Sequence, residues 1–211
     1  EYLQVYDGNI TWVDNESFIE FASGKTVPVN IFMGVDPASS IKKHADYSTI
    51  VSVAVDEKNN KYVLPYFRKR CKPMDLADKI IDYFKLYKPV KTRIESVGYQ
   101  EMLRDYLRTR ADEEGLFIPG LEIKESPRSS KSSRLETMHP FFAQKKMHIQ
   151  KNMTELKDEL LMFPRGKHDD LLDGLYYATK HNYPPNHEMH KTNNHHIQGK
   201  FGKKSDDWLI T

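Results

Sequence analysis

The sequence has a single cysteine, no long apolar run and almost no excess of charge of either sign. Cys71 has no partner within the chain, so a disulfide-stapled extracellular domain is excluded and a reducing, cytoplasmic setting is expected. No apolar stretch approaches the roughly 18 residues that a membrane span needs. Residues 1–10 also lack the basic-then-apolar pattern of a signal peptide. With 32 Lys and Arg against 30 Asp and Glu, any affinity for nucleic acid must come from a local surface.

The 211 residues are enough for one globular domain with a core of its own, since 38% are hydrophobic and 11% are aromatic. Asn-Gly and Asp-Asn pairs punctuate short alternating segments in residues 1–30, which predicts an N-terminal hairpin or linker. Residues 184–211 are rich in Asn, His, Lys and Gly and predict a flexible polar tail. The domain itself is therefore expected to span residues 31–183.

One short motif suggests a nucleotide site. Gly24-Lys25-Thr26 resembles the end of a phosphate-binding P-loop. The first glycine of that motif would fall at Ile19, which cannot form the required nest of backbone amides. We therefore expect no ATP site in this chain.

The middle of the chain alternates between strand and helix patterns. Three apolar or β-branched runs predict consecutive antiparallel strands, at 31–35, 49–55 and 62–67. Helical spacing then alternates with further short strands, at 92–97, 121–123 and 147–149. A last helix is predicted from about Asp169. This order predicts an α/β fold with a mixed sheet, three antiparallel strands followed by parallel ones, flanked by helices.

Acidic residues occur where a buried charge is costly unless it is paired. Asp36 directly follows an apolar strand, and Glu95 lies in another. Asp169, Asp170 and Asp173 open the last helix, where Asp170 and Asp173 share one face. Each carboxylate alone has a structural explanation, as a helix cap, a strand end or a lysine partner. Together they would repel without a cation, and carboxylates on rigid elements are what a hard divalent ion requires. Two such ions about 4 Å apart can activate a water and stabilise a departing 3′ oxygen.

Four segments of the chain carry a resemblance to a known family. They are Phe32-Met33-Gly34-Val35-Asp36-Pro37-Ala38, Asp46-Tyr47-Ser48, Ile94-Glu95-Ser96-Val97-Gly98 and His168-Asp169-Asp170-Leu171-Leu172-Asp173-Gly174-Leu175. Across roughly residues 32–181 they resemble the nuclease domain of tailed-bacteriophage large terminase subunits. The resemblance implies an RNase H-like fold and a two-metal endonuclease, using Mg²⁺ or Mn²⁺, that cuts concatemeric double-stranded DNA during viral genome packaging.

The resemblance also implies roles for residues and partners. Asp36, Glu95 and one of the tandem aspartates would form the metal-binding triad. Similarity to the Asp-x-x-Asp of RNase H-like resolvases favours Asp170, with Asp173 in support, although the motif does not decide between Asp169 and Asp170. The implied partners are a terminase ATPase domain, the small terminase subunit and the portal, in the cytoplasm of the host cell.

DNA contacts are expected in the Ser-rich, basic stretch at 124–134. Lys131 and Arg134 are the preferred phosphate contacts, with Arg128 beside them. The alternative is a solvated loop leading into a capped helix at Ser132 or Ser133. Two further residues are secondary candidates: Asp46, if its loop folds back, and His168, which would orient water or bind metal or simply be a polar neighbour.

Two other functions fit the same residues. A resolvase on the same fold would cut branched DNA better than linear DNA. A catalytically silent docking module would use its acidic groove to hold a basic partner. The intact set of carboxylates argues against the silent module.

Overall fold

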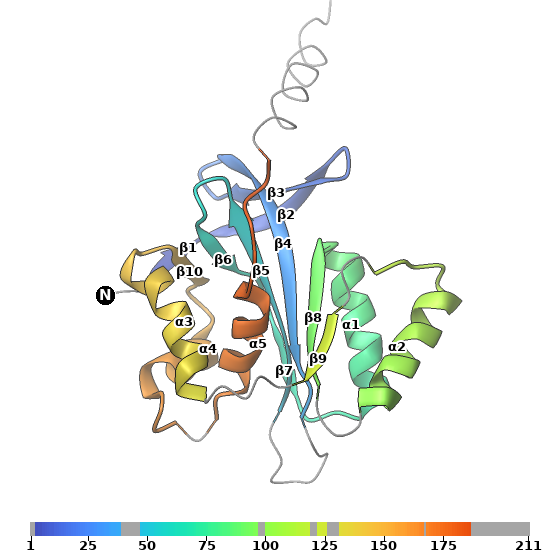
Figure 1. The fold of residues 1–211 in the computed structure, drawn as a ribbon. Helices are drawn as coiled ribbons and strands as arrows, with labels where there is room; N and C mark the ends of the chain where they lie inside the picture. The colour runs from blue at the N-terminus through green and yellow to red at the C-terminus, as the bar shows by residue number, and fades with distance from the viewer. Residues whose placement is uncertain are drawn as a thin grey trace, which may run out of the picture.

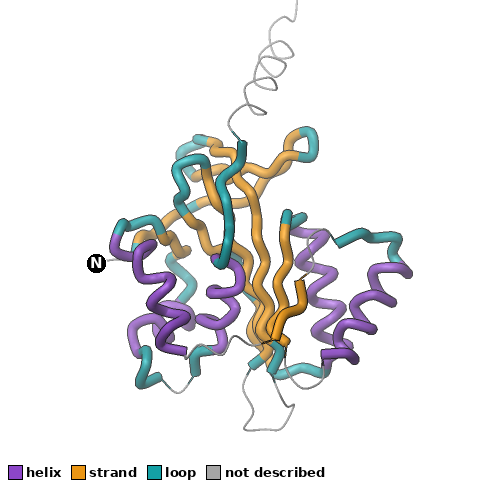
Figure 2. Tube along the Cα trace, in the orientation of Figure 1, coloured by secondary structure: helices purple, strands orange, loops and turns teal. Residues whose placement is uncertain are grey.

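The computed structural model describes residues 3–38, 47–96, 100–118, 122–125, 131–166 and 168–186. Its helices are α1 (Pro73–Tyr87), α2 (Gln100–Glu113), α3 (Lys131–Ala143), α4 (Thr154–Met162) and α5 (Asp170–Thr179). A mixed sheet separates α3, α4 and α5 from α1 and α2 (Figure 1). Figure 2 shows the same arrangement as a layer of strands between two groups of helices. No helix in the described ranges combines the length and the hydrophobicity that crossing a membrane requires.

The strands follow one another in a mostly antiparallel path before parallel strands join. Their bounds are β1 (Gln4–Tyr6), β2 (Gly8–Val13), β3 (Glu16–Phe21), β4 (Thr26–Asp36), β5 (Ser48–Asp56), β6 (Lys61–Val63), β7 (Phe67–Lys69), β8 (Lys91–Ser96), β9 (Glu122–Glu125) and β10 (Met147–Gln150). Successive pairs from β2 to β6 are antiparallel. β8 pairs with β4, β9 with β8, and β10 with both β6 and β1, all in parallel. The predicted mixed sheet, antiparallel and then parallel, is confirmed.

The third predicted strand, 62–67, is two short strands. β6 and β7 both pair with β5 but at different places, with Val63 opposite Val53 and Phe67 opposite Ile50. Pro65 lies between them. Proline has no N–H to donate to a sheet, which explains why the pairing is interrupted there.

Residues 3–30 are part of the same sheet. β2 and β3 form a hairpin that turns at Asp14 and Asn15, both with positive φ (48° and 70°). β3 continues onto β4, which begins at Thr26 rather than near residue 31. Ile19 of β3 is fully buried. The N-terminal segment therefore extends the sheet by pairing, and of the predicted tail only residues 184–186 lie in the described ranges.

Both faces of the central strands are covered. Along β4, Phe32 packs in the cluster under α3, α4 and α5, whereas Met33 and Val35 pack in the cluster under α1 and α2. A strand buried on both faces has an unbroken apolar sequence instead of an alternating one. This explains the apolar run before Asp36.

Helix α5 lies unusually close to β4 and β5 because two glycines face the contact. A β-carbon on Gly34 would overlap backbone atoms of Gly174 and Ala178 and would lie 2.9 Å from the carbonyl carbon of Tyr177. A β-carbon on Gly174 would lie 2.8 Å from Thr49 Oγ1. Because these two positions are glycines, the first turn of α5, which carries Asp170 and Asp173, can lie beside the end of β4.

Candidate metal centre

Two predicted carboxylates come from the ends of neighbouring parallel strands. Asp36 is the last residue of β4, and Glu95 is the next-to-last residue of β8. β4 and β8 pair in parallel with Val35 opposite Ile94, so the residues that follow each partner lie side by side. Adjacent strands are separated by about 4.8 Å. The sheet therefore fixes Asp36 next to Glu95.

The third carboxylate of the group is Asp173, in the first turn of α5. One carboxylate oxygen each from Asp36, Glu95 and Asp173 lie within 4.8 Å of one another. Glu95 and Asp173 are buried, with 5% and 8% exposure, and Asp36 is partly buried. The N-terminal end of a helix favours negative charge, which helps to hold Asp173 there. Oxygen ligands at this spacing on three rigid elements fit a hard divalent cation.

The electrostatics of the group also fit a cation. Burial, a hydrogen bond to Glu95 and the negative charges of Glu95, Asp173 and Asp170 together raise the pKa of Asp36 well above its usual range. Like charges brought close together favour protonation of one member unless a cation compensates for them.

Arg134 of α3 lies inside this group. Its Nη1 donates to Asp173 Oδ1 at 2.7 Å, and its Nη2 donates to Glu95 Oε1 at 2.8 Å. The residue is only 7% exposed. Burial alone would lower the pKa of its guanidinium, but the carboxylates of Asp173 and Glu95 raise it above its usual value. The sequence predicts Arg134 as a phosphate contact; the structure instead buries it against the acidic group, because its guanidinium reaches Asp173 on α5 and Glu95 on β8.

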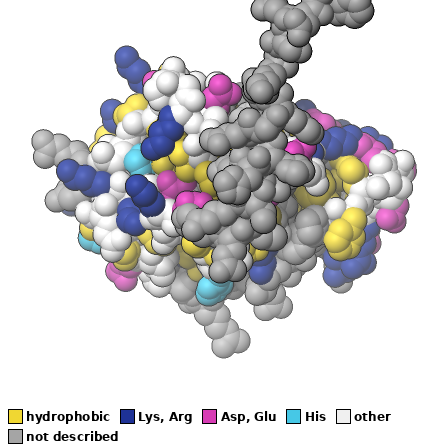
Figure 3. Space-filling model, turned by 90° about the horizontal axis from the view of Figure 1, so that it is seen from above, with side chains coloured by type: hydrophobic (Ala, Val, Ile, Leu, Met, Phe, Trp, Pro, Cys, Tyr) yellow, Lys and Arg dark blue, Asp and Glu magenta, His cyan; other side chains and the backbone are white. Residues whose placement is uncertain are grey.

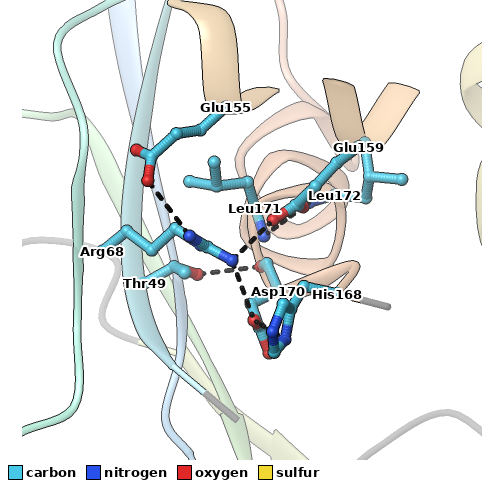
Figure 4. Close-up of polar contacts among 8 residues, drawn as sticks. All are labelled: Thr49, Arg68, Glu155, Glu159, His168, Asp170, Leu171 and Leu172. Carbon is cyan, nitrogen blue, oxygen red and sulfur yellow. Dashed lines mark hydrogen bonds and ion pairs between the residues drawn. The ribbon is translucent and has the colours of Figure 1, made fainter. Parts of the chain in front are cut away.

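Asp170 faces a different set of partners (Figure 4). Its Oδ2 lies 3.8 Å from Arg68 Nη2 and 3.6 Å from His168 Nδ1. Its backbone carbonyl accepts a hydrogen bond from Thr49 Oγ1 at 3.0 Å. Asp170 contributes to the raised pKa of Asp36 and so lies near the triad, but it is not among the three clustered carboxylates. His168 is placed beside Asp170 and packs edge-on against Tyr47, with 5.2 Å between ring centroids.

The start of α5 is capped from α4. Asp169 occupies the N-cap position, but its side chain makes no capping hydrogen bond. Instead Glu159 Oε2 accepts the backbone N–H groups of Leu171 at 2.9 Å and Leu172 at 3.3 Å (Figure 4). Glu159 also pairs with Arg68 at 3.4 Å. Glu159 is not among the predicted site residues. Its position three residues after Leu156 places it on the same, inward face of α4, which is the one sequence signal for its role.

Glu159 is expected to make the stability of the fold depend on pH. Burial raises its pKa from 4.5 to about 7, although Arg68 opposes the shift. Its contribution to the free energy of unfolding is therefore complete below about pH 4.5 and is lost as the pH rises through 7. Between pH 4.5 and 8 the free energy of unfolding of the wild type should fall relative to Glu159→Gln by up to about 3 kcal/mol, at about 1.4 kcal/mol per pKa unit.

Urea denaturation of the wild type and Glu159→Gln in EDTA at several pH values measures this difference in the free energy of unfolding. Glu155→Gln is the matched control, because Glu155 also pairs with Arg68 (3.1 Å) but is 56% exposed. A difference between wild type and Glu159→Gln that stays constant with pH would show that the burial of Glu159 does not control its titration.

The remaining predicted residues lie partly outside the described ranges. Arg128 and Asp46 fall on residues that the structure does not describe. Lys131, within the Ser-rich, basic stretch at 124–134, is the first residue of α3. On the face seen from above, basic and acidic side chains are interspersed where the described surface is visible (Figure 3). This agrees with the absence of a net charge large enough to bind DNA by itself.

Known proteins share this fold and sequence pattern. The chain matches the family model for the terminase RNase H-like domain over residues 33–182. No curated protein matches the sequence. Among solved structures, the large terminase nuclease from thermophilic phage G20c is similar, with a TM-score of 0.53 and 14% identity, over 86% of this chain and 95% of that chain.

Two metal-bound forms of the same nuclease are similar as well. The form with bound zinc gives a TM-score of 0.56 at 15% identity, over 86% of this chain and 95% of that chain. The form with bound magnesium gives 0.53 at 15% identity, over 84% and 92%. At this identity the likeness establishes the RNase H-like fold. Because the family model covers well over half of the sequence, the predicted resemblance is confirmed: the chain belongs to the family of terminase RNase H-like nuclease domains.

Proposed function

We propose that this chain is the divalent-metal-dependent endonuclease of a viral DNA-packaging terminase, hydrolysing phosphodiester bonds of concatemeric double-stranded DNA. The observation that carries the proposal is the convergence of Asp36, Glu95 and Asp173, from two strand ends and one helix, within 4.8 Å. Membership in the terminase nuclease family and the likeness to a nuclease solved with bound magnesium support it.

The donor set suits two Mg²⁺ or Mn²⁺ ions. When bound, such ions lower the pKa of a water and offset the charge of the phosphate and of the departing 3′ oxygen. Asp36 lies within 4.8 Å of both other carboxylates, and their charges raise its pKa. We therefore assign Asp36 as the ligand that the two ions would share, with Glu95 and Asp173 each holding one of them. Asp173 thus takes the role that the sequence motif suggested for Asp170. Asp170, bound to Arg68 and close to His168, positions the start of α5.

The substrate and partners follow from the same proposal. Backbone phosphates would contact the basic stretch at 124–134, with Lys131 and Arg128 as the contacts. This binding would have little sequence preference, because phosphate contacts carry no base information. In the host cytoplasm the domain would act with a terminase ATPase domain, the small terminase subunit and the portal.

Plasmid cleavage tests the proposal. Supercoiled plasmid is incubated with the wild-type chain in Mg²⁺, in Mn²⁺ or in EDTA, and an Asp36→Asn chain purified in parallel controls for contaminating nucleases. We expect nicked and then linear plasmid with either metal, and neither product in EDTA or with Asp36→Asn.

Two results would contradict the proposal. An intact plasmid under every condition, with wild-type protein that is folded by circular dichroism, would favour a silent docking module. Cleavage of a cruciform much faster than of linear duplex would favour a resolvase.

A further inference from the structure

Arg134 connects two of the three clustered carboxylates. It reaches Asp173 on α5 and Glu95 on β8 at 2.7 and 2.8 Å, one nitrogen of the guanidinium to each. The planar guanidinium carries several N–H donors in a fixed arrangement, so it can hold two carboxylates at once through charge-assisted hydrogen bonds. The bridge joins three elements that are far apart in the sequence, namely α3, α5 and β8.

The same carboxylates are the ones that fit a divalent cation. Asp36, Glu95 and Asp173 place three acidic groups in a mostly buried space. A buried cluster of this kind is costly unless a positive charge compensates for it. A divalent ion at this place would be a second positive charge beside the guanidinium, and it would compete with Arg134 for the carboxylate oxygens.

We propose that Arg134 is an internal counter-ion of the metal-free site, which holds Glu95 and Asp173 together and is displaced when a divalent cation binds. The inference rests on the proposed function, since it assigns the cation to the same carboxylates. Arg134 lies in the first turn of α3, three residues after Lys131 and within the basic stretch at 124–134.

The first test measures metal affinity without DNA and without turnover. Free Mn²⁺ is followed by electron paramagnetic resonance during titration of the wild type, Arg134→Met and Arg134→Lys. Removing the competing charge is expected to tighten Mn²⁺ binding by Arg134→Met at least about tenfold, equal to about 1.4 kcal/mol. Arg134→Lys keeps the charge but loses the bridge between the two carboxylates, and its Mn²⁺ affinity should fall between those of the wild type and Arg134→Met.

The matched control is Arg68→Met. Arg68 is another mostly buried arginine that pairs with acidic residues beside the site, but its partners are Glu155, Glu159 and Asp170 and not the triad. Its removal should lower stability and leave Mn²⁺ affinity near that of the wild type. Arg134→Met should also melt at a lower temperature than the wild type in EDTA and gain more stability from saturating Mn²⁺.

A second measurement uses the wild-type chain and so does not depend on whether a variant folds. Phenylglyoxal modifies accessible arginine, and mass spectrometry reports the modification of Arg134 relative to the half-exposed Arg110. We expect faster modification of Arg134 with Mn²⁺ than with EDTA. Equal modification in both, or Mn²⁺ binding by folded Arg134→Met that is no tighter than by the wild type, overturns the inference. Absence of Mn²⁺ binding by the wild type would instead overturn the proposed function.

Discussion

Asp173→Asn is expected to lose metal-dependent DNA cleavage by more than about 100-fold, whereas Asp170→Asn should lose about 10-fold to 100-fold. Residues that only orient metal ligands typically contribute 10-fold to 100-fold to activity, and a direct ligand contributes more. Asp173 belongs to the three carboxylates within 4.8 Å of one another. Asp170 is the nearest competitor for the role, but its Oδ2 lies between Arg68 and His168.

The measurement is the initial rate of plasmid nicking at saturating Mn²⁺ for both variants. Asp36→Asn is the control for a site that has lost a metal ligand. Asp82→Asn is the control for an Asp-to-Asn change away from the site, because Asp82 is exposed on α1. Thermal melts confirm that each chain is folded. If Asp170→Asn were as slow as Asp36→Asn while Asp173→Asn stayed active, Asp170 would be the third ligand, as the Asp-x-x-Asp comparison favoured.

Gly34→Ala is expected to destabilise the fold by about 3 kcal/mol or more, at the upper end of what overpacking a core costs. The added methyl group would meet backbone atoms of Gly174, Ala178 and Tyr177, which cannot rotate away as a side chain can. Helix α5 would have to withdraw from β4. The fraction of Gly34→Ala protein that folds should have lost most of its cleavage activity, because Asp173 would move away from Asp36.

Urea denaturation and plasmid nicking measure the two effects. Gly24→Asn is the control, because Gly24 has a φ of 79° and open space around its Cα, and asparagine tolerates that conformation better than most residues. A Gly34→Ala chain within about 1 kcal/mol of the wild type would mean that α5 can shift without losing its packing.

The order of the predicted strands is enough to place the two strand carboxylates, Asp36 and Glu95, near each other. Asp36 follows an apolar run and Glu95 lies in a short predicted strand, and parallel strands bring their ends to the same edge. The motif favoured Asp170, with Asp173 in support, and left Asp169 open as an alternative, whereas the structure groups Asp173 with Asp36 and Glu95. Helical periodicity places Asp170 and Asp173 on one face, so it does not separate them. The depth to which α5 sits on β4 separates them, and that depth is set by Gly34 and Gly174.

Tertiary packing also decided the residues that the sequence analysis placed differently or did not find. An arginine in a Ser-rich, basic stretch is typical of an exposed surface, and nothing local indicates that Arg134 turns inward to α5. Glu159 belongs to α4 but caps the first turn of the next helix, α5. Arg134 lies 39 residues from both of its partners and Glu159 lies 12 residues before Leu171. Helical spacing from Leu156 indicates that Glu159 faces inward, but it does not indicate which groups either side chain meets.

The parallel pairing of β4 and β8 leaves the site with a single adjustable part. Asp36 and Glu95 are held at the fixed separation of adjacent strands. Asp173 is on a helix, and a helix can slide along a sheet or rotate on it. Changes at Gly174 within α5, or at the glutamate that caps α5, can therefore alter the size of the ion that the site accepts by moving the helix, while the spacing of the two strand carboxylates stays fixed.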